Sequence, residues 1–310
     1  ESSVRDRARF LVALGNHDHG TVVQQCAEVL DEPSGELVGR VVGEEFAAHL
    51  AEQEGWPDEL DTDRLHRAFR ELDMAGIVAR LDHTCCQNCG ISEIGEEYPD
   101  EEERRGYVFA HRQDMEAAVS GGGLTLSYGV LSHGEQPSEA QAGIGQEVAE
   151  ALRRHGLEVG WDGDPRERID VSLTWRRRRF GPLAAWPGAE PPAGGPLEIS
   201  YCNLPRGEVQ NGWVPASFLH ARDVLLTTTP YAGNFINFKP AASGGGLIAM
   251  WRPGPVLNFE IPLDEDSARS VTIAEAERLV STLAEEGRVA LPDDPARGSC
   301  VATMLPGRSM

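Results

Sequence analysis

The hydrophobic pattern of the chain changes near Gly76, and this change limits the folds that the sequence can adopt. Before Gly76, apolar residues recur every three to four positions, which is the period of an amphipathic helix. Helices are expected at residues 4–14, 22–30, 37–53 and from the predicted N-cap Asp61 to Gly76. The first part of the chain, residues 1–80, is therefore predicted to be helical and to lead directly into a strand.

Beyond Gly76, short apolar runs alternate with helical segments. Strands are expected at residues 77–79, 107–110, 124–128, 157–161 and 169–175, and helices at 114–119 and 144–155. The Asp162-Gly163 pair between the last two strands is typical of a hairpin turn. This alternation predicts a small mixed sheet with helices on one face, within an α/β unit at residues 81–179 that carries a cysteine motif.

A segment rich in proline, glycine and alanine, residues 180–196, is the predicted linker to a smaller α+β unit at residues 197–310. Strands are expected there at residues 197–202, 224–229, 235–238, 247–251 and 256–261. Thr272 and Glu275 form a capping-box pattern for a final helix that Gly287 closes. The predicted fold class of the whole chain is α+β.

The formal net charge of -22 restricts the partners of the protein. Phosphate contacts need clustered cations, so neither nucleic acid nor an anionic membrane is expected to bind. The sequence lacks an apolar run of the roughly 20 residues that a membrane span needs, and residues 1–6 lack a secretory pattern. We therefore expect a cytoplasmic protein whose partner is another protein.

One basic run, Arg176 to Arg179, stands out against the acidic background. Four arginines at a strand end would either dock an acidic group or form a solvated edge that discourages strand pairing. The solvated edge is the favoured interpretation. The fragment His17-Asp18-His19 looks like part of a metal site, but a helix boundary with Asp18 as the N-cap is favoured there.

The most distinctive chemical motif is His-Thr-Cys-Cys-Gln-Asn-Cys-Gly at residues 83–90. Cys86 and Cys89 have the spacing at which two thiolates bind one metal ion or form a disulfide. Adjacent side chains of extended backbone point to opposite faces, so Cys85 is expected to face away from Cys86. A closed zinc site needs four ligands. The missing ligands would come from Cys85, His83, His111, Asp114 or His133.

Four interpretations of this motif stay open. The cysteines would form a zinc site completed by a histidine, remain structural thiols without metal, form a redox-active disulfide, or act as a catalytic thiolate or open-site zinc. In the last case His111 would be the general base and Asp114 would orient its ring. The alternative for these two residues is structural, with Asp114 capping the following helix and His111 packing at its start.

Several stretches of the chain share the pattern of a known family. They are residues 65–72 and 75–80, the motif Cys85-Cys86-Gln87-Asn88-Cys89-Gly90, and residues 106–114, 169–171 and 175–178. Together they resemble an uncharacterised family of actinobacterial proteins, a domain of unknown function, over residues 38–179. The resemblance implies no activity. It draws attention to Cys85, Cys86, Cys89, His111, Gln113 and Asp114 as one candidate site.

The sequence contains no complete catalytic signature. A Walker A motif, a Gly-x-Ser-x-Gly elbow and a dinucleotide-binding glycine pattern after a strand are all missing. We therefore predict an interaction or regulatory protein whose cysteine motif is structural or holds zinc. The alternative is an enzyme that depends on a thiolate or on zinc and uses Cys86 and Cys89 with His111 and Asp114.

Overall fold

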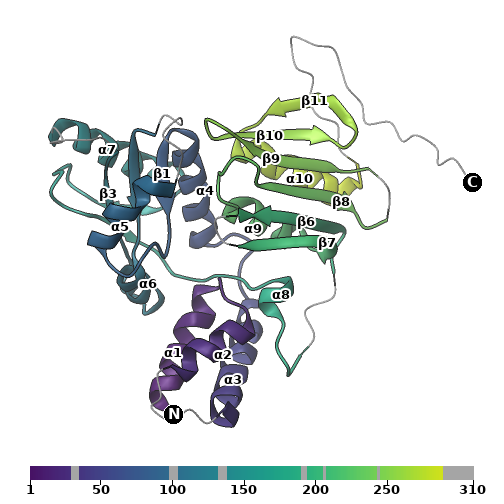
Figure 1. Ribbon diagram of the computed structural model, residues 1–310, viewed down its shortest axis with the longest axis horizontal. Helices are drawn as coiled ribbons and strands as arrows, with labels where there is room; N and C mark the ends of the chain where they lie inside the picture. The colour runs from purple at the N-terminus through teal and green to yellow at the C-terminus, as the bar shows by residue number, and fades with distance from the viewer. Residues whose placement is uncertain are drawn as a thin grey trace, which may run out of the picture. The chain divides into compact units, whose positions relative to one another are not determined.

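The computed structural model describes residues 1–28, 35–97, 104–131, 138–189, 194–204, 207–242 and 245–288. The chain divides into two compact units, unit 1 (Glu1–Pro192) and unit 2 (Ala193–Met310). Each unit combines helices with one β-sheet (Figure 1), so the predicted α+β fold class is confirmed. Among the described residues, the helices are all too short or too polar to cross a membrane.

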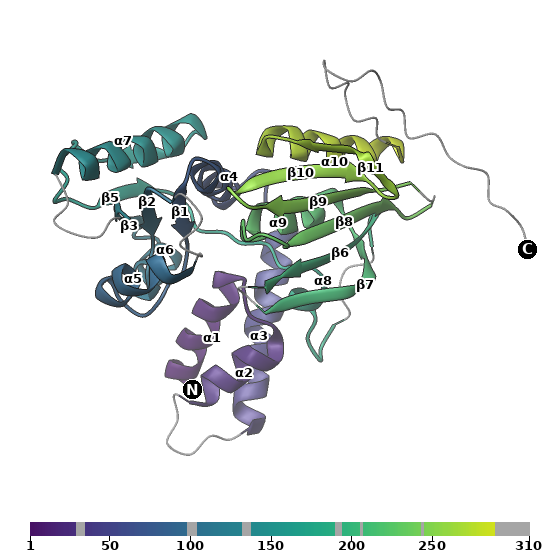
Figure 2. The same cartoon turned by 45° about the horizontal axis from the view of Figure 1, so that its top comes forward.

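Unit 1 begins with three helices that pack against one another, drawn in purple in Figures 1 and 2. They are α1 (Ser2–Leu14), α2 (His19–Ala27) and α3 (Gly35–Gln53). Their apolar faces supply fully buried side chains such as Leu11 and Phe46. The predicted cap of α2 is confirmed, because the Asp18 carboxylate accepts a hydrogen bond of 2.7 Å from the Thr21 N–H.

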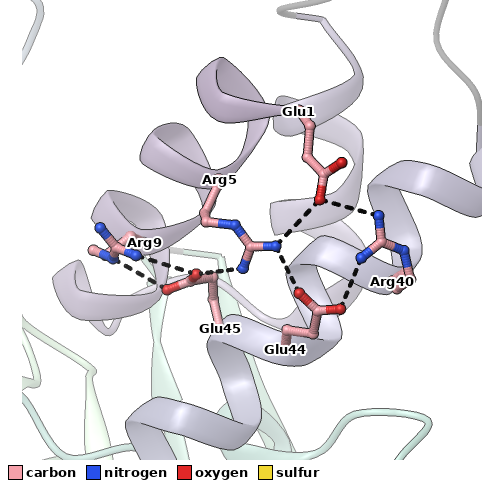
Figure 3. A network of polar contacts seen from close by, with 6 residues as sticks. All are labelled: Glu1, Arg5, Arg9, Arg40, Glu44 and Glu45. Carbon is pink, nitrogen blue, oxygen red and sulfur yellow. Dashed lines mark hydrogen bonds and ion pairs between the residues drawn. The ribbon is translucent and has the colours of Figure 1, made fainter.

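A network of ion pairs joins the outer sides of α1 and α3 (Figure 3). Arg5 pairs with Glu44 at 2.7 Å and with Glu45 at 3.0 Å, and Arg40 pairs with Glu1 at 3.1 Å. Water screens ion pairs at a helix surface, so they add little to stability. The apolar contacts therefore supply most of the stability of this helical region.

The sheet of unit 1 has five strands in the order β1-β2-β3-β5-β4. The strands are β1 (Ile77–Arg80), β2 (Gly106–Phe109), β3 (Leu124–Val130), β4 (Glu158–Gly160) and β5 (Ile169–Ser172). β1 and β2 are parallel and the other neighbours are antiparallel, so the predicted mixed sheet and the β4–β5 hairpin are confirmed. The helices of this region are α4 (Asp61–Met74), α5 (Gln87–Glu93), α6 (Arg112–Val119), α7 (Ser138–Arg154) and α8 (Gly181–Ala184).

Helices cover both faces of this sheet, and the prediction of helices on one face is wrong. Side chains alternate along a strand, so Gly106 and Phe109 of β2 point to opposite faces. A Cβ on Gly106 would lie 2.6 Å from Ile144 of α7, whereas the Phe109 ring packs on Gly90 of α5. Figure 2 shows α7 and α5 on opposite sides of the strands. The difference arises because the cysteine motif begins a helix, α5, that closes the second face.

The arginine run after β5 is largely buried, which contradicts the predicted solvated edge. Arg176 is exposed, but Arg177 and Arg178 are buried and Arg179 has no exposed surface. The Arg179 guanidinium donates to the carbonyl oxygens of Val12 at 2.9 Å and Leu183 at 2.7 Å. The carbonyls at the C-terminal end of a helix lack intrahelical partners, and Arg179 satisfies one at the end of α1. Burial lowers the pKa of Arg179 to about 9.

Unit 2 contains a six-stranded antiparallel sheet in the order β11-β10-β9-β8-β6-β7. The strands are β6 (Leu197–Asn203), β7 (Glu208–Ala216), β8 (Phe235–Pro240), β9 (Leu247–Arg252), β10 (Val256–Ile261) and β11 (Asp264–Ser270). Two helices, α9 (Phe218–Thr227) and α10 (Ile273–Glu286), pack against each other and contact β8. The predicted cap of α10 is confirmed, because Thr272 accepts a hydrogen bond from the Glu275 N–H and Gly287 has φ 68°.

The predicted strand at residues 224–229 is wrong. Residues 224–227 form the end of α9, which begins where Ser217 accepts a hydrogen bond from the His220 N–H, and residues 228 and 229 follow the helix. A short apolar run fits a buried helix and a strand equally well, and only the cap resolves the choice. The edge strands β7 and β11 were not predicted, because their exposed and polar residues dilute the strand pattern. The predicted linker at 180–196 and the predicted boundary at residue 80 stay predictions.

Candidate functional site

The cysteine motif begins with a sharp turn after β1. Asp82 and Thr84 have φ values of 54° and 61°, in the left-handed region that non-glycine residues rarely adopt. The His83 N–H donates to the Ala110 carbonyl at 2.9 Å, and the Arg112 N–H donates to the Thr84 carbonyl at 3.1 Å. These bonds fix the turn to the connection between β2 and α6. A left-handed β-branched residue such as Thr84 is strained, so the surrounding contacts must hold it in place.

The turn brings the three thiols of the motif together. Cys86 is the N-cap of α5 and Cys89 lies in the first turn of that helix. The sulfur atoms of Cys85, Cys86 and Cys89 all lie within 4.8 Å of one another, and the Cys85 and Cys89 sulfurs are 3.7 Å apart. The prediction that Cys85 faces away is therefore wrong. It assumed an extended run of residues, whereas Thr84 is left-handed and Cys86 is the extended N-cap from which α5 begins.

The three thiols differ in acidity. The Cys86 sulfur accepts hydrogen bonds from the Cys89 N–H and from the thiols of Cys89 and Cys85. These bonds lower the pKa of Cys86 below its ordinary value of 9.0. Hydrogen bonds with Cys86 and Cys85 raise the pKa of Cys89 to about 11. Cys85 is exposed, and the other two are half-buried. The arrangement favours a thiolate at Cys86 that accepts hydrogen bonds from the neighbouring thiols. A bound cation would displace the protons of the remaining thiols.

The spacing of the sulfurs fits a metal ion. Two sulfurs each about 2.3 Å from a tetrahedral zinc ion lie about 3.8 Å from each other. The Cys85 and Cys89 sulfurs are 3.7 Å apart without any rearrangement. Thiolates select zinc, monovalent copper and other soft or borderline cations over magnesium and calcium. The three cysteines can therefore hold a metal ion, and the donor type restricts which one.

His111 and Asp114 form a helix cap beside the motif, as the structural alternative predicted. His111 is the N-cap of α6, and the Asp114 carboxylate accepts a hydrogen bond of 3.0 Å from its N–H. The same carboxylate pairs with Arg168 at 2.6 Å and lies 3.3 Å from the His111 ring. Burial lowers the pKa of His111. In the described part of the chain, neither side chain belongs to the group of potential metal ligands around the thiols.

The other predicted ligands occupy different places. The His83 ring packs edge-on against Phe109, with ring centroids 5.6 Å apart, and lies outside the thiol group found among the described residues. Gln113 is exposed on the first turn of α6. His133 falls outside the described residues. Cys85, Cys86 and Cys89 are thus the predicted ligands that the structure brings together.

Gly90 and Phe109 support the site in a way that the sequence did not predict. Gly90 is helical and buried within α5. A Cβ at this position would overlap the Phe109 ring. The contact holds the first turn of α5, and therefore Cys89, against the sheet. The only sequence signal for it is a glycine next to a cysteine on a short helix, which also fits a turn.

The fold and the site define an α+β unit with a cluster of three thiols near its surface. A family model described as Domain of unknown function (DUF6891) matches residues 1–179, more than half of the chain, so the chain belongs to this family. The match includes α1 to α3, and so begins before residue 38, where the resemblance was expected to start. Searches of the curated proteins and of the solved structures find no match. The actinobacterial origin stays a prediction.

Proposed function

We propose that unit 1 is a zinc-binding module of an interaction or regulatory protein, with Cys85, Cys86 and Cys89 as ligands. The observation that carries the proposal is the convergence of three sulfur atoms within 4.8 Å. Zinc suits the site because it accepts thiolate ligands, favours tetrahedral geometry and undergoes no redox change. The predicted cytoplasmic location agrees with this, since thiols stay reduced there.

The proposed ion would act first as a local cross-link. Cys85 belongs to the turn that follows β1, whereas Cys86 and Cys89 belong to the N-terminal end of α5. α5 has 7 residues, and a helix this short is marginal without tertiary support. An ion bound by all three sulfurs would tie the turn to the helix, and through the Arg112–Thr84 bond it would also stabilise the start of α6.

The surface position of the cluster supports a regulatory or interaction role. Cys85 is exposed, so a bound ion would lie near the protein surface. His111 and Asp114, the pair proposed for catalysis, are instead engaged in the α6 cap. The acidic net charge of -22 favours another protein over nucleic acid as the partner.

Metal titration of the full chain tests this proposal. Reduced protein is loaded with zinc, and bound metal is measured by elemental analysis and by competition with a chromogenic chelator. We expect one zinc ion per chain. The Cys89→Ser variant should bind zinc more than about 100-fold more weakly, which exceeds the effect of changing a residue that only contacts a ligand. Cys202→Ala, in unit 2, is the matched control and should bind as the unaltered chain does. Protein that takes up no zinc, or Cys89→Ser with unchanged affinity, contradicts the proposal.

One observation favours a second candidate, an enzyme with Cys86 as nucleophile. The lowered pKa of Cys86 is a property of reactive thiols. In this proposal His111 acts as the base and Asp114 orients it. Alkylation of Cys86 followed against pH, in the unaltered chain and in His111→Ala, tests it. A shift of the profile to higher pH in the variant supports the role of His111, and an unchanged profile contradicts it.

A further inference from the structure

We infer that the metal ion in this site has one coordination position open to a ligand from outside unit 1, and that this ligand is a neutral nitrogen donor of the imidazole type. The inference rests on the proposed function. Tetrahedral zinc takes four ligands, and closed structural sites supply all four from the protein. In the described part of unit 1, the only side chains in reach of one ion are the three thiols.

The two described histidines that were predicted as ligands, His83 and His111, make other contacts. The His83 ring packs against the Phe109 ring, and the backbone N–H of His83, not its ring, donates to the Ala110 carbonyl at 2.9 Å. His111 is buried at the start of α6, with its ring 3.3 Å from the Asp114 carboxylate. Moving either ring to the thiols would break its contact with Phe109 or with Asp114. The conformation of the turn therefore favours a site with three ligands from this part of the chain.

The direction of the strands places the end of β3 away from the thiols. β1 and β2 run in parallel, and both end next to the cysteine motif. β3 runs the opposite way, so Leu131 lies at the far end of β2, where its N–H donates to the Arg105 carbonyl at 3.2 Å. Gly95 contacts Leu131 at this same end. The length of β2, three steps of about 3.3 Å, separates this end from the motif.

The charge of the site selects the class of ligand. One zinc ion with three thiolates carries a net charge of −1. A fourth anionic ligand would make the site more negative, in a chain that is already acidic. A neutral donor adds no charge, and imidazole is a ligand that zinc accepts readily. Thiolates also donate electron density to zinc, so a bound water should be less acidic than at a site of three histidines. The open position therefore suits ligand binding better than hydrolysis.

Cobalt substitution of the full chain tests the inference, because the visible absorption of Co²⁺ reports its donor set. The cobalt-loaded chain is titrated separately with imidazole, sodium azide and 2-mercaptoethanol. We expect a saturable change of the cobalt bands with imidazole, at concentrations at least about tenfold lower than for azide or the thiol. X-ray absorption of the zinc form should show three sulfurs and one lighter atom, and ring scattering should appear when imidazole is added. His83→Phe should respond like the unaltered chain.

The outcomes separate this inference from the proposed function. A chain that binds neither cobalt nor zinc overturns both. Bound metal with four sulfurs, or with a spectrum that imidazole leaves unchanged, overturns the open position and leaves the metal site intact. A His133→Ala variant whose spectrum before any addition differs from that of the unaltered chain shows that the fourth ligand comes from the chain itself, and also overturns it. Tighter binding of azide or 2-mercaptoethanol than of imidazole overturns the ligand class.

Discussion

Unit 1 contains two clusters of like residues, and each behaves differently from its sequence pattern. The arginine run at Arg176 to Arg179 was predicted to be solvated, yet three of its members are buried. The cysteines at residues 85–89 were predicted to diverge, yet their sulfurs converge within 4.8 Å. Both differences arise because a polar group takes its position from the partners that the fold brings to it.

The kind of partner separates a structural cluster from a candidate site. The Arg179 guanidinium donates to backbone carbonyls of Val12, His17 and Leu183, which lie on three different segments. These bonds use its donors to join parts of the same unit. The thiols of Cys85, Cys86 and Cys89 instead interact chiefly with one another, and sulfur is a weak partner for hydrogen bonds. Their capacity to bind a ligand is therefore still available.

The largest effect is expected from Arg179→Ala, which tests whether the arginine run is a structural element. The substitution leaves buried carbonyls without donors and removes the guanidinium from above the Phe46 ring, 4.5 Å from its centroid. We expect the free energy of unfolding to fall by about 4 kcal/mol, measured by urea unfolding with circular dichroism. Arg176→Ala, at the exposed end of the run, is the control and should cost less than about 1 kcal/mol. Equal effects at both positions would show that burial does not make Arg179 more important for stability than Arg176.

A pH dependence is expected next, from the histidine that holds the arginine run. The His49 ring nitrogen lies 2.9 Å from the Arg177 carbonyl, and burial lowers the pKa of His49 from 6.5 to about 4. The folded state therefore binds this proton more weakly than the unfolded state. The stabilisation is complete above pH 6.5 and is lost as the pH falls towards 4, by about 2 to 3 kcal/mol.

The variant His49→Gln isolates this contribution, because glutamine can still donate to the Arg177 carbonyl but does not titrate. Urea unfolding between pH 7 and pH 4 should show a smaller loss of stability in the variant than in the unaltered chain. Hydrogen exchange of α3 peptides should locate the difference in unit 1. Identical slopes in the two proteins would show that His49 is not the group responsible.

The smallest of the three effects is expected from Gly90→Ala, which tests whether the contact with Phe109 positions the cysteine motif. The added methyl group would overlap the Phe109 ring, so α5 must shift. We expect a loss of about 2 kcal/mol in stability together with weaker zinc binding. Gly39→Ala is the control, since a Cβ there meets nothing within 4 Å and alanine favours the helix. Zinc affinity that is unchanged in Gly90→Ala would show that the Phe109 contact does not position Cys89.

Several features that depend on neighbouring residues were predictable from the sequence, although the N-cap of α4 is Leu60 and not the predicted Asp61. Asp18 and Thr272 cap their helices through bonds to N–H groups three residues ahead, so the pattern alone predicts them. The hairpin of β4 and β5 follows from local alternation and a turn. The stretch at 224–229 could not be assigned, because three apolar residues followed by three threonines are compatible with a strand or with a helix. Its state depends on the cap at Ser217, which precedes the run by seven residues.

The α+β class, most of the capped helices and one pair of cysteines with metal-ligand spacing, Cys86 and Cys89, could be predicted from the sequence. Only the tertiary structure decided that Cys85 joins the other two and that Arg177 to Arg179 are buried. The physical reason is the range of the interactions. Caps and alternation act within a few residues, whereas the turn at Thr84 is held by Ala110 and Arg112, and Arg179 bonds to a carbonyl 167 residues away.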